Sequence, residues 1–182
     1  MLKKSLQFGL LLALLGVLPA IAQTTQIRQL PGDKFKATLI GYDEVPALSS
    51  TGAGTFSVQV DPSDTFFDYQ LSYAGLTGNV AQAHIHIAQK GVNGGIMVFF
   101  CTNLGNGPPG TQLCPGPNAG SVSGRITAAD VVASAAAQGI AAGEFAEVLA
   151  AMRAGTVYVN VHSTVFPGGE IRGQLTQDIP LK

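Results

Sequence analysis

Apolar and polar residues alternate along most of this chain of 182 residues. A period of two is typical of β-strands that bury one face, because successive side chains of a strand point to opposite sides. We therefore expect a mainly β domain whose first strands form an antiparallel meander and whose last two form a hairpin. The alternation predicts strands at 34–39, 55–60, 67–73, 81–87, 156–162 and 170–177, with less regular candidates at 96–100 and 121–126.

One segment, residues 127–154, is rich in alanine and lacks the alternation. Thr127 followed by Asp130 resembles a helix-capping pair, and Gly139 is suited to end the helix that they begin. A second helix over 144–153 would place four apolar side chains on one face: Phe145, Val148, Leu149 and Met152. We expect a short helical insertion around 127–154 that covers one end of the β-domain.

The first 22 residues have the pattern of a secretory signal peptide. Two lysines precede an apolar run at 8–18, and Ala20 and Ala22 fit the small-residue rule for cleavage before Gln23. An uncleaved membrane anchor is the alternative, but the apolar run is shorter than the roughly 18 residues that span a bilayer. We expect the leader to be removed.

Removal of the leader places the rest of the chain outside the cytoplasm. We expect a lead-in over 23–33 and a domain over 34–178, in a protein that is secreted or periplasmic and keeps no membrane anchor. Thiols in such a compartment meet oxidising conditions, so Cys101 and Cys114 predict a structural disulfide. A redox-active pair is the alternative, although such pairs normally use C-x-x-C spacing.

Charge in this chain is scarce and balanced, with ten Lys and Arg against eleven Asp and Glu. Nucleic-acid binding depends on clustered positive charge, so we expect no nucleic-acid partner. The sequence also lacks a G-x-S-x-G nucleophile motif. A hydrolase would have only His162 and Glu170 as base and acid, with no positioned nucleophile. We therefore expect a non-enzymatic protein with no catalytic residues.

The chain has three histidines, and all of them lie in two of the predicted strands. Side chains at i and i+2 share a strand face, so His84 and His86 point the same way. The same rule groups Tyr158, Asn160 and His162 in one strand, and Glu170, Arg172 and Gln174 in the next. If these strands are neighbours, a single polar face holds three imidazoles, a carboxylate and a guanidinium.

Two interpretations of this polar face stay open. Three imidazoles can bind Zn²⁺ or Cu²⁺, which predicts a metal site at His84, His86 and His162, with Glu170 or Glu44 as a further ligand. Alternatively, the face is a structural layer of hydrogen bonds, in which Glu170 pairs with Arg172 or with a histidine.

Several motifs resemble the CHRD domain family. They are Glu44-Val45-Pro46, Leu71-Ser72-Tyr73 with Gly75-Leu76, Ala83-His84-Ile85-His86 with Gly91 and Gly94, and Tyr158–Ser163 followed by Phe166–Leu175. The resemblance covers Phe35 to Leu175. This domain recurs in chordin, an extracellular antagonist of bone morphogenetic proteins, and in many exported bacterial proteins. It implies an extracellular antiparallel Greek-key β-sandwich, of immunoglobulin-like or Cu,Zn superoxide dismutase-like type.

Two departures limit what the resemblance implies. The chain lacks the cysteine-rich modules with which chordin holds growth factors, so antagonism of a growth factor is not implied. The strand Ala83–His86 is similar to the copper-binding strand of Cu,Zn superoxide dismutase, but three histidines cannot complete that enzyme's pair of metals.

Two functions from different classes follow. The first is a non-enzymatic CHRD module that binds an extracytoplasmic protein or surface component. The second is a mononuclear Cu or Zn protein that uses His84, His86 and His162, with a redox or metal-scavenging role.

Overall fold

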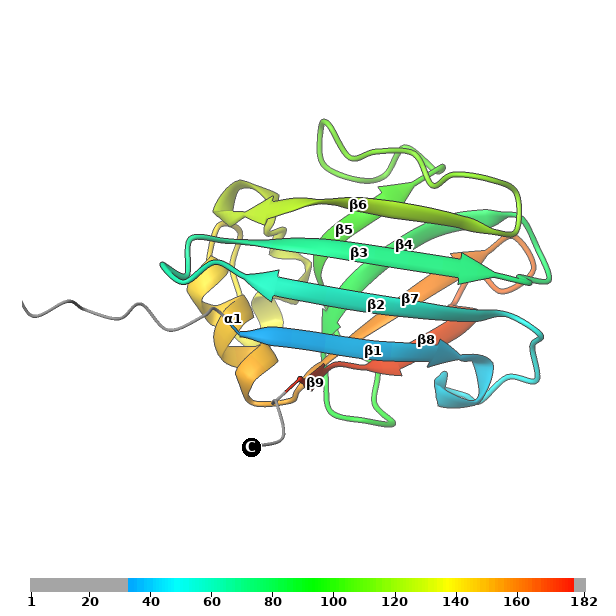
Figure 1. The fold of residues 1–182 in the computed structure, drawn as a ribbon, viewed down its shortest axis with the longest axis horizontal. Helices are drawn as coiled ribbons and strands as arrows, with labels where there is room; N and C mark the ends of the chain where they lie inside the picture. Colours follow the sequence, from blue (N-terminus) through cyan, green and yellow to red (C-terminus); the bar gives the residue numbers. More distant parts are fainter. Residues whose placement is uncertain (1–32, 179–182) are drawn as a thin grey trace, which may run out of the picture.

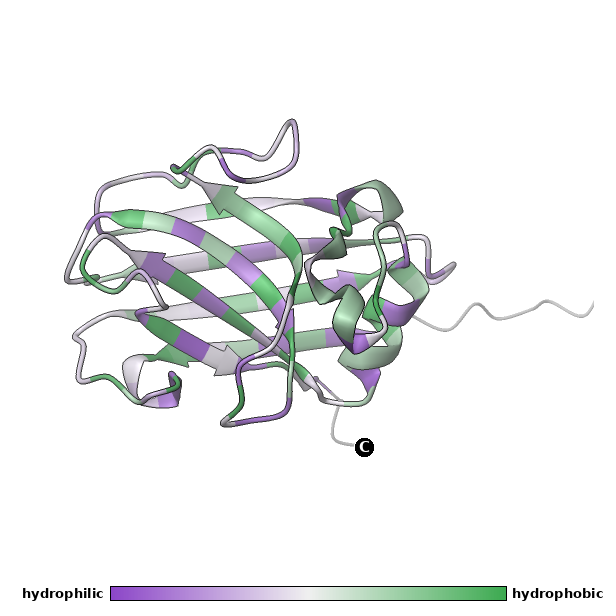
Figure 2. Cartoon of the chain, turned by 180° about the vertical axis from the view of Figure 1, so that it is seen from behind, coloured by the Kyte–Doolittle hydropathy of each residue, from purple (hydrophilic) through white to green (hydrophobic). Residues whose placement is uncertain are grey.

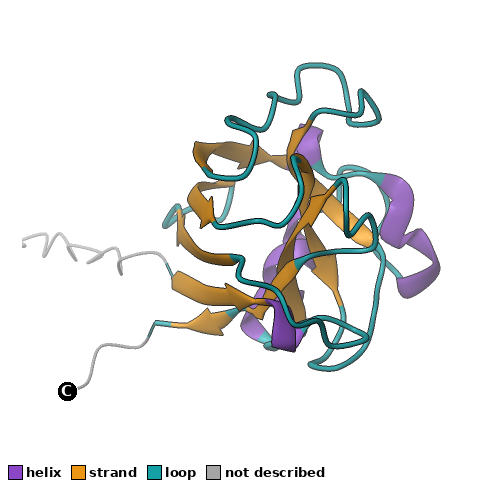
Figure 3. Ribbon diagram, turned by 90° about the vertical axis from the view of Figure 1, so that its right-hand side faces the viewer, coloured by secondary structure: helices purple, strands orange, loops and turns teal. Residues whose placement is uncertain are grey.

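The computed structural model describes residues 33–178. It contains an antiparallel sheet of nine strands that folds over into two layers and is nearly closed as a barrel (Figures 1 and 3). The strands are β1 (Lys34–Ile40), β2 (Ala53–Val60), β3 (Phe66–Ala74), β4 (Val80–Ile87), β5 (Ile96–Thr102), β6 (Gly120–Thr127), β7 (Val157–Ser163), β8 (Ile171–Gln174) and β9 (Thr176–Gln177). The mainly β, sandwich-like fold expected from the sequence is confirmed.

The predicted signal peptide, residues 1–22, and nearly all of the predicted lead-in lie outside the described residues. Among the helices of residues 33–178, none is long and apolar enough to cross a membrane.

The front layer of Figure 1 consists of β6, β3, β2 and β1, in that order. Strands β1, β2 and β3 form the predicted meander, with Ala37 opposite Phe56 and Phe56 opposite Leu71. Because this register keeps apolar residues opposite one another, each strand turns one face into the core and exposes the other.

The rear layer consists of β5, β4, β7 and β8. The chain crosses to this layer after β3, returns so that β6 pairs with β3, and crosses again so that β7 pairs with β4. These crossings between layers are the Greek-key connections expected for the family. They bring β4 and β7, the two strands that carry all three histidines, side by side.

The last predicted strand, 170–177, is wrong as a single element, because it divides at Leu175 into β8 and β9. Residue Arg172 of β8 pairs with Ile40 of β1, which joins the rear layer to the front layer. A Cβ at Gly173 would lie 2.2 Å from the backbone oxygen of Thr38, so glycine is required where the strands approach. Beyond this corner, β9 pairs with β1 instead of β7.

The helical insertion is present but begins differently from the prediction. Thr127 and Asp130 form the expected capping box, yet they start a 3-10 turn, η2 (Ala128–Asp130), instead of an α-helix. The next residue, Val131, has extended backbone and is buried in the core. The helix predicted from Thr127 therefore ends after a single turn.

The rest of the insertion closes one end of the sandwich, at the left of Figure 1. A second 3-10 segment, η3 (Ala133–Gln138), ends at Gly139 in the left-handed conformation, as the sequence predicted. The following helix, α1 (Phe145–Arg153), buries the expected apolar stripe. A short 3-10 turn, η1 (Gly41–Asp43), follows β1 at the other end.

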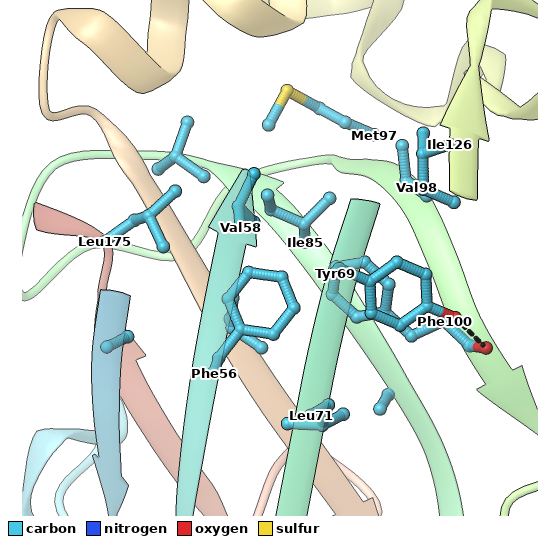
Figure 4. Close-up of a cluster of buried hydrophobic side chains, with 14 of the residues drawn as sticks. Phe56, Val58, Tyr69, Leu71, Ile85, Met97, Val98, Phe100, Ile126 and Leu175 are labelled. Atoms are coloured by element: carbon cyan, nitrogen blue, oxygen red, sulfur yellow. Dashed lines mark hydrogen bonds between the residues drawn. The ribbon is translucent and has the colours of Figure 1, made fainter. Parts of the chain in front are cut away.

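The core lies between the two layers and is centred on three aromatic rings (Figure 4). Phe100 of β5 packs against Tyr69 and Phe56 of the front layer, with ring centroids 4.5 and 4.8 Å apart. The hydroxyl of Tyr69 donates to the Phe100 backbone oxygen at 3.2 Å. The predicted disulfide between Cys101 and Cys114 is present beside this cluster and fixes the loop after β5.

Candidate metal centre

The outer face of the rear layer is polar and yet buried, because loops fold over it. Strand register places His84 opposite Asn160, and Asn160 opposite Arg172. Hydrophilic residues alternate along β4 and β7 where Figure 2 views this layer from behind. The side chains of this face are His84 and His86 from β4, Tyr158, Asn160 and His162 from β7, and Arg172 and Gln174 from β8.

The three histidines meet at one point of this face. One ring nitrogen from each lies within 4.8 Å of one from each of the others. The Nδ1 atom of His84 is 3.2 Å from Nε2 of His162. None of the three side chains is more than 7% exposed. The sequence prediction that these residues share one face is therefore matched by their positions.

Two loops cover this face, one between β4 and β5 and one between β7 and β8. Their backbone carbonyls set the orientation of two of the rings. Nδ1 of His86 donates to the oxygen of Gly94 at 3.0 Å, and Nδ1 of His162 donates to the oxygen of Pro167 at 2.9 Å. A carbonyl can only accept, so in each neutral ring the hydrogen is on Nδ1 and the lone pair is on Nε2. This arrangement is typical of histidines that bind a metal through Nε2.

The loop that supplies the first carbonyl depends on glycine. A Cβ at Gly94 would lie 1.7 Å from the backbone oxygen of Ile87, so no other residue permits this path of the chain. Because the loop returns so closely to the end of β4, it places the Gly94 oxygen against the ring of His86.

Burial keeps all three imidazoles neutral. Burial, together with the neighbouring His162 and His86, lowers the pKa of His84 to about 2. Burial also lowers the pKa of His86 to about 4 and lowers the pKa of His162, against the opposing effects of their carbonyl partners. Neutral imidazole is the form that binds Zn²⁺ or Cu²⁺, so the donors are ready at neutral pH.

A stack of side chains supports the cluster on one side. The ring of His86 lies parallel to that of Tyr158, with an interplanar angle of 2° and centroids 4.6 Å apart. The guanidinium of Arg172 lies over the Tyr158 ring at 3.3 Å. It also donates to Asn93 Oδ1 and to the backbone oxygen of Val92, which ties the stack to the covering loop.

The two carboxylates considered as further ligands occupy different places. Glu170 accepts from the hydroxyl of Ser50 and from the backbone N–H of Thr77, each at 2.6 Å, so it joins loops at one end of the sandwich. Burial raises its pKa, but hydrogen bonds from Ser163, Ser50 and Thr77 outweigh this effect and lower the pKa overall. Within residues 33–178, the metal-ligand cluster contains the three histidines and neither glutamate.

The second carboxylate, Glu44, lies in the polar layer beside Asn160. It is 6% exposed, and its Oε1 has no hydrogen-bond partner. Burial raises its pKa, whereas the backbone N–H of Val45, the charge of Arg172 and the amide of Asn160 act to lower it. The carboxylate that accompanies the histidines and Arg172 is thus the one carried by the loop after β1.

Sequence reasoning did not assign a role to Tyr158, nor to the carbonyls of Gly94 and Pro167. Every residue has a backbone carbonyl, so the type of residue does not reveal which carbonyl accepts a hydrogen bond from a histidine. The available signal was the family motif itself, in which Gly94 and Pro167 are among the residues that resemble the CHRD domain.

Comparison with known proteins agrees with the fold and the motifs. No curated protein and no solved structure matches the chain significantly. The sequence model of the CHRD domain matches residues 35–175, which include β2 to β8 in full and all of β1 except Lys34, and which end just before β9. This chain belongs to the CHRD domain family.

Proposed function

We propose that this protein is an exported, non-enzymatic CHRD-domain protein that binds one Zn²⁺ or copper ion at His84, His86 and His162. The observation that carries the proposal is the orientation of the rings. His86 and His162 donate their outer N–H groups to loop carbonyls, which leaves Nε2 lone pairs on the inner side of a buried cluster.

The spacing of the nitrogens supports binding of a single ion. Nitrogens that lie 2.0 to 2.1 Å from a tetrahedral ion are about 3.4 Å from one another. The 3.2 Å between Nδ1 of His84 and Nε2 of His162 is close to this value. The other separations are at most 4.8 Å, so the rings would have to move closer together around a bound ion.

The 3.2 Å spacing assigns Nδ1 of His84 to the ion, so the other nitrogen of this ring does not distinguish a metal site from a structural layer of hydrogen bonds. The Nε2 atom of His84 is buried and has no hydrogen-bond partner. Leaving a buried polar atom unsatisfied costs about 1–3 kcal/mol, and most buried polar groups in proteins avoid it. The ring is also packed edge-on against Phe99, with centroids 4.3 Å apart, so water has little access to it.

Recognition of an extracytoplasmic protein or surface component is less well supported as the role of this face. Partners contact exposed atoms, and the three histidines and Arg172 are 0–7% exposed beneath the loops. A recognition role would therefore require another surface of the domain.

Metal analysis of tag-free protein tests the proposal. Purified protein is loaded with excess Zn²⁺ or Cu²⁺, freed of unbound metal, and analysed by mass spectrometry of the elements. We expect one equivalent of metal in the wild type and loss of that metal in His84→Ala and His162→Ala.

The matched control is Gln70→Ala, because Gln70 is an exposed strand residue on the front layer. It should retain one equivalent. Absence of metal from the loaded wild type, or equal metal content in wild type and both histidine variants, would contradict the proposal.

A further inference from the structure

Asn160 lies between the histidine cluster and Glu44. Its Oδ1 is 3.1 Å from Nε2 of His86. Its Nδ2 and the Oε1 of Glu44 both approach Gly169, where a Cβ would lie 2.9 Å from the first atom and 2.3 Å from the second. The Asn160 side chain is 3% exposed, so the amide is buried.

Oδ1 of Asn160 faces the lone pair on Nε2 of His86. His86 has one N–H in its neutral form, and Nδ1 uses it to donate to the Gly94 oxygen. Nε2 is then an acceptor, and the atom 3.1 Å away is also an acceptor. Two acceptors at this distance repel each other unless a cation lies between them.

The carboxylate of Glu44 lies on the same side as the NH₂ group of Asn160, near Gly169, although its Oε1 makes no hydrogen bond. A carboxylate only accepts hydrogen bonds, so it favours the NH₂ group of Asn160 on its side and Oδ1 on the side of His86. Burial raises the pKa of Glu44 overall, and the amide of Asn160 is one of the groups that oppose this rise. Rotation of the amide through half a turn would instead place Oδ1 of Asn160 on the side of the Glu44 carboxylate, near Gly169.

We infer that Asn160 Oδ1 is the fourth metal ligand and that Glu44 is the positioning residue that directs it. This inference rests on the proposed function, since it completes the same site. The donor set is then three imidazole nitrogens and one amide oxygen. Four protein ligands leave no open position, as in structural zinc sites, which agrees with a non-enzymatic protein.

The donor set also predicts which ions bind. Imidazole suits both zinc and copper, whereas an oxygen donor is hard and the soft Cu⁺ ion favours thiolate and thioether ligands. The only two cysteines of the chain are joined in a disulfide. The site should therefore hold Zn²⁺ and Cu²⁺ more tightly than Cu⁺.

Substitution of Asn160, with Zn²⁺ and Cu²⁺ as probes, tests the assignment in the full mature chain. Affinity is measured by competition with a chelator, and the copper form is examined by electron paramagnetic resonance. Asn160→Ala removes the oxygen and should weaken binding by about tenfold or more. Asn160→Asp supplies a charged oxygen at the same place, so it should tighten binding and change the copper spectrum.

A matched control adds the same charge elsewhere, at the exposed Asn118 on the loop before β6. Asn118→Asp should leave affinity and spectrum as in the wild type. Glu44→Gln provides a second route if the Asn160 variants do not fold. Its amide can attract Oδ1 of Asn160 away from His86, so affinity should fall by about 10- to 100-fold, as for other residues that orient metal ligands.

Two results would overturn the assignment while leaving the three-histidine site intact. The first is unchanged affinity in Asn160→Ala or, if that variant does not fold, in Glu44→Gln. The second is weaker binding by Asn160→Asp than by the wild type, which would mean that an amide N–H faces His86. A wild type that takes up neither Zn²⁺ nor Cu²⁺ would instead remove the proposed function, and this assignment with it.

Discussion

Replacement of Glu170 by glutamine should destabilise the fold without releasing the metal. The Glu170 carboxylate is fully buried and accepts hydrogen bonds from Ser50 and Thr77, each at 2.6 Å. These residues precede β2 and follow β3, so the carboxylate holds together three segments that are distant in sequence. Glutamine has nearly the same shape and keeps an acceptor oxygen, but it loses the negative charge.

The expected loss follows from the change in these two hydrogen bonds. A hydrogen bond to a charged group contributes about 1.5–3 kcal/mol, and one between neutral groups contributes about 0.5–1.5 kcal/mol. Weakening both bonds should therefore lower the free energy of unfolding by roughly 2–3 kcal/mol. Glu170→Ala also leaves the Thr77 N–H unsatisfied and opens a cavity, so it should cost more.

Urea unfolding and metal analysis of the same samples measure the two effects. The control is Glu147→Gln, since Glu147 is exposed on α1 and should change the midpoint little. An unchanged midpoint in Glu170→Gln would refute the hydrogen-bond reasoning. Loss of metal with an unchanged midpoint would show that Glu170 is a ligand, as one interpretation of the sequence proposed.

The difference in stability between the wild type and Glu170→Gln should also depend on pH. The pKa of Glu170 in the folded protein is lowered from the ordinary value of 4.5. The stabilisation that it provides is then fully present above pH 4.5 and is lost as the pH falls through the lowered pKa. The difference in unfolding free energy between wild type and Glu170→Gln should shrink below pH 4.5, whereas a constant difference would contradict the lowered pKa.

Three further predictions concern the rest of the chain. Replacing both Cys101 and Cys114 by alanine should lower the free energy of unfolding by about 3 kcal/mol, because the disulfide closes a short loop, and the denaturant midpoint would show this. Gly169→Ala should displace Glu44, since the new Cβ would meet its Oε1 and the backbone φ is 128°; chelator competition should then show weaker metal binding. Intact-mass analysis of the exported protein should find Gln23 as its first residue, and a mass that includes the leader would contradict cleavage.

Sequence and structure agree best on which face of its strand each side chain occupies. Successive side chains of a strand point to opposite faces, so an odd or even position decides which of them face the core. This is a local property of the strand. The alternation at 156–162 therefore predicted correctly that Val159 and Tyr158 lie on opposite faces. The capping box at Thr127 and the stop at Gly139 were predictable for the same reason, because both depend on a few neighbouring residues.

Local pattern could not predict where helix and strand would be interrupted. Val131 has extended backbone and is buried in the core instead of continuing the helix, and the last strand breaks where β8 reaches β1. Both interruptions depend on segments that are distant along the chain. Propensity and periodicity take no account of such contacts, so the sequence predicted longer regular elements than the structure contains.

The sequence by itself determined the family, the two-faced strands and the grouping of His84 and His86 on one face. Tertiary structure decided that His162 meets them, that Gly94 and Pro167 orient the rings, and that Glu44 instead of Glu170 lies in the polar layer. The physical reason is that a strand places its side chains by a fixed local repeat. A loop, by contrast, reaches its position only when the packed layers provide the surface that it covers.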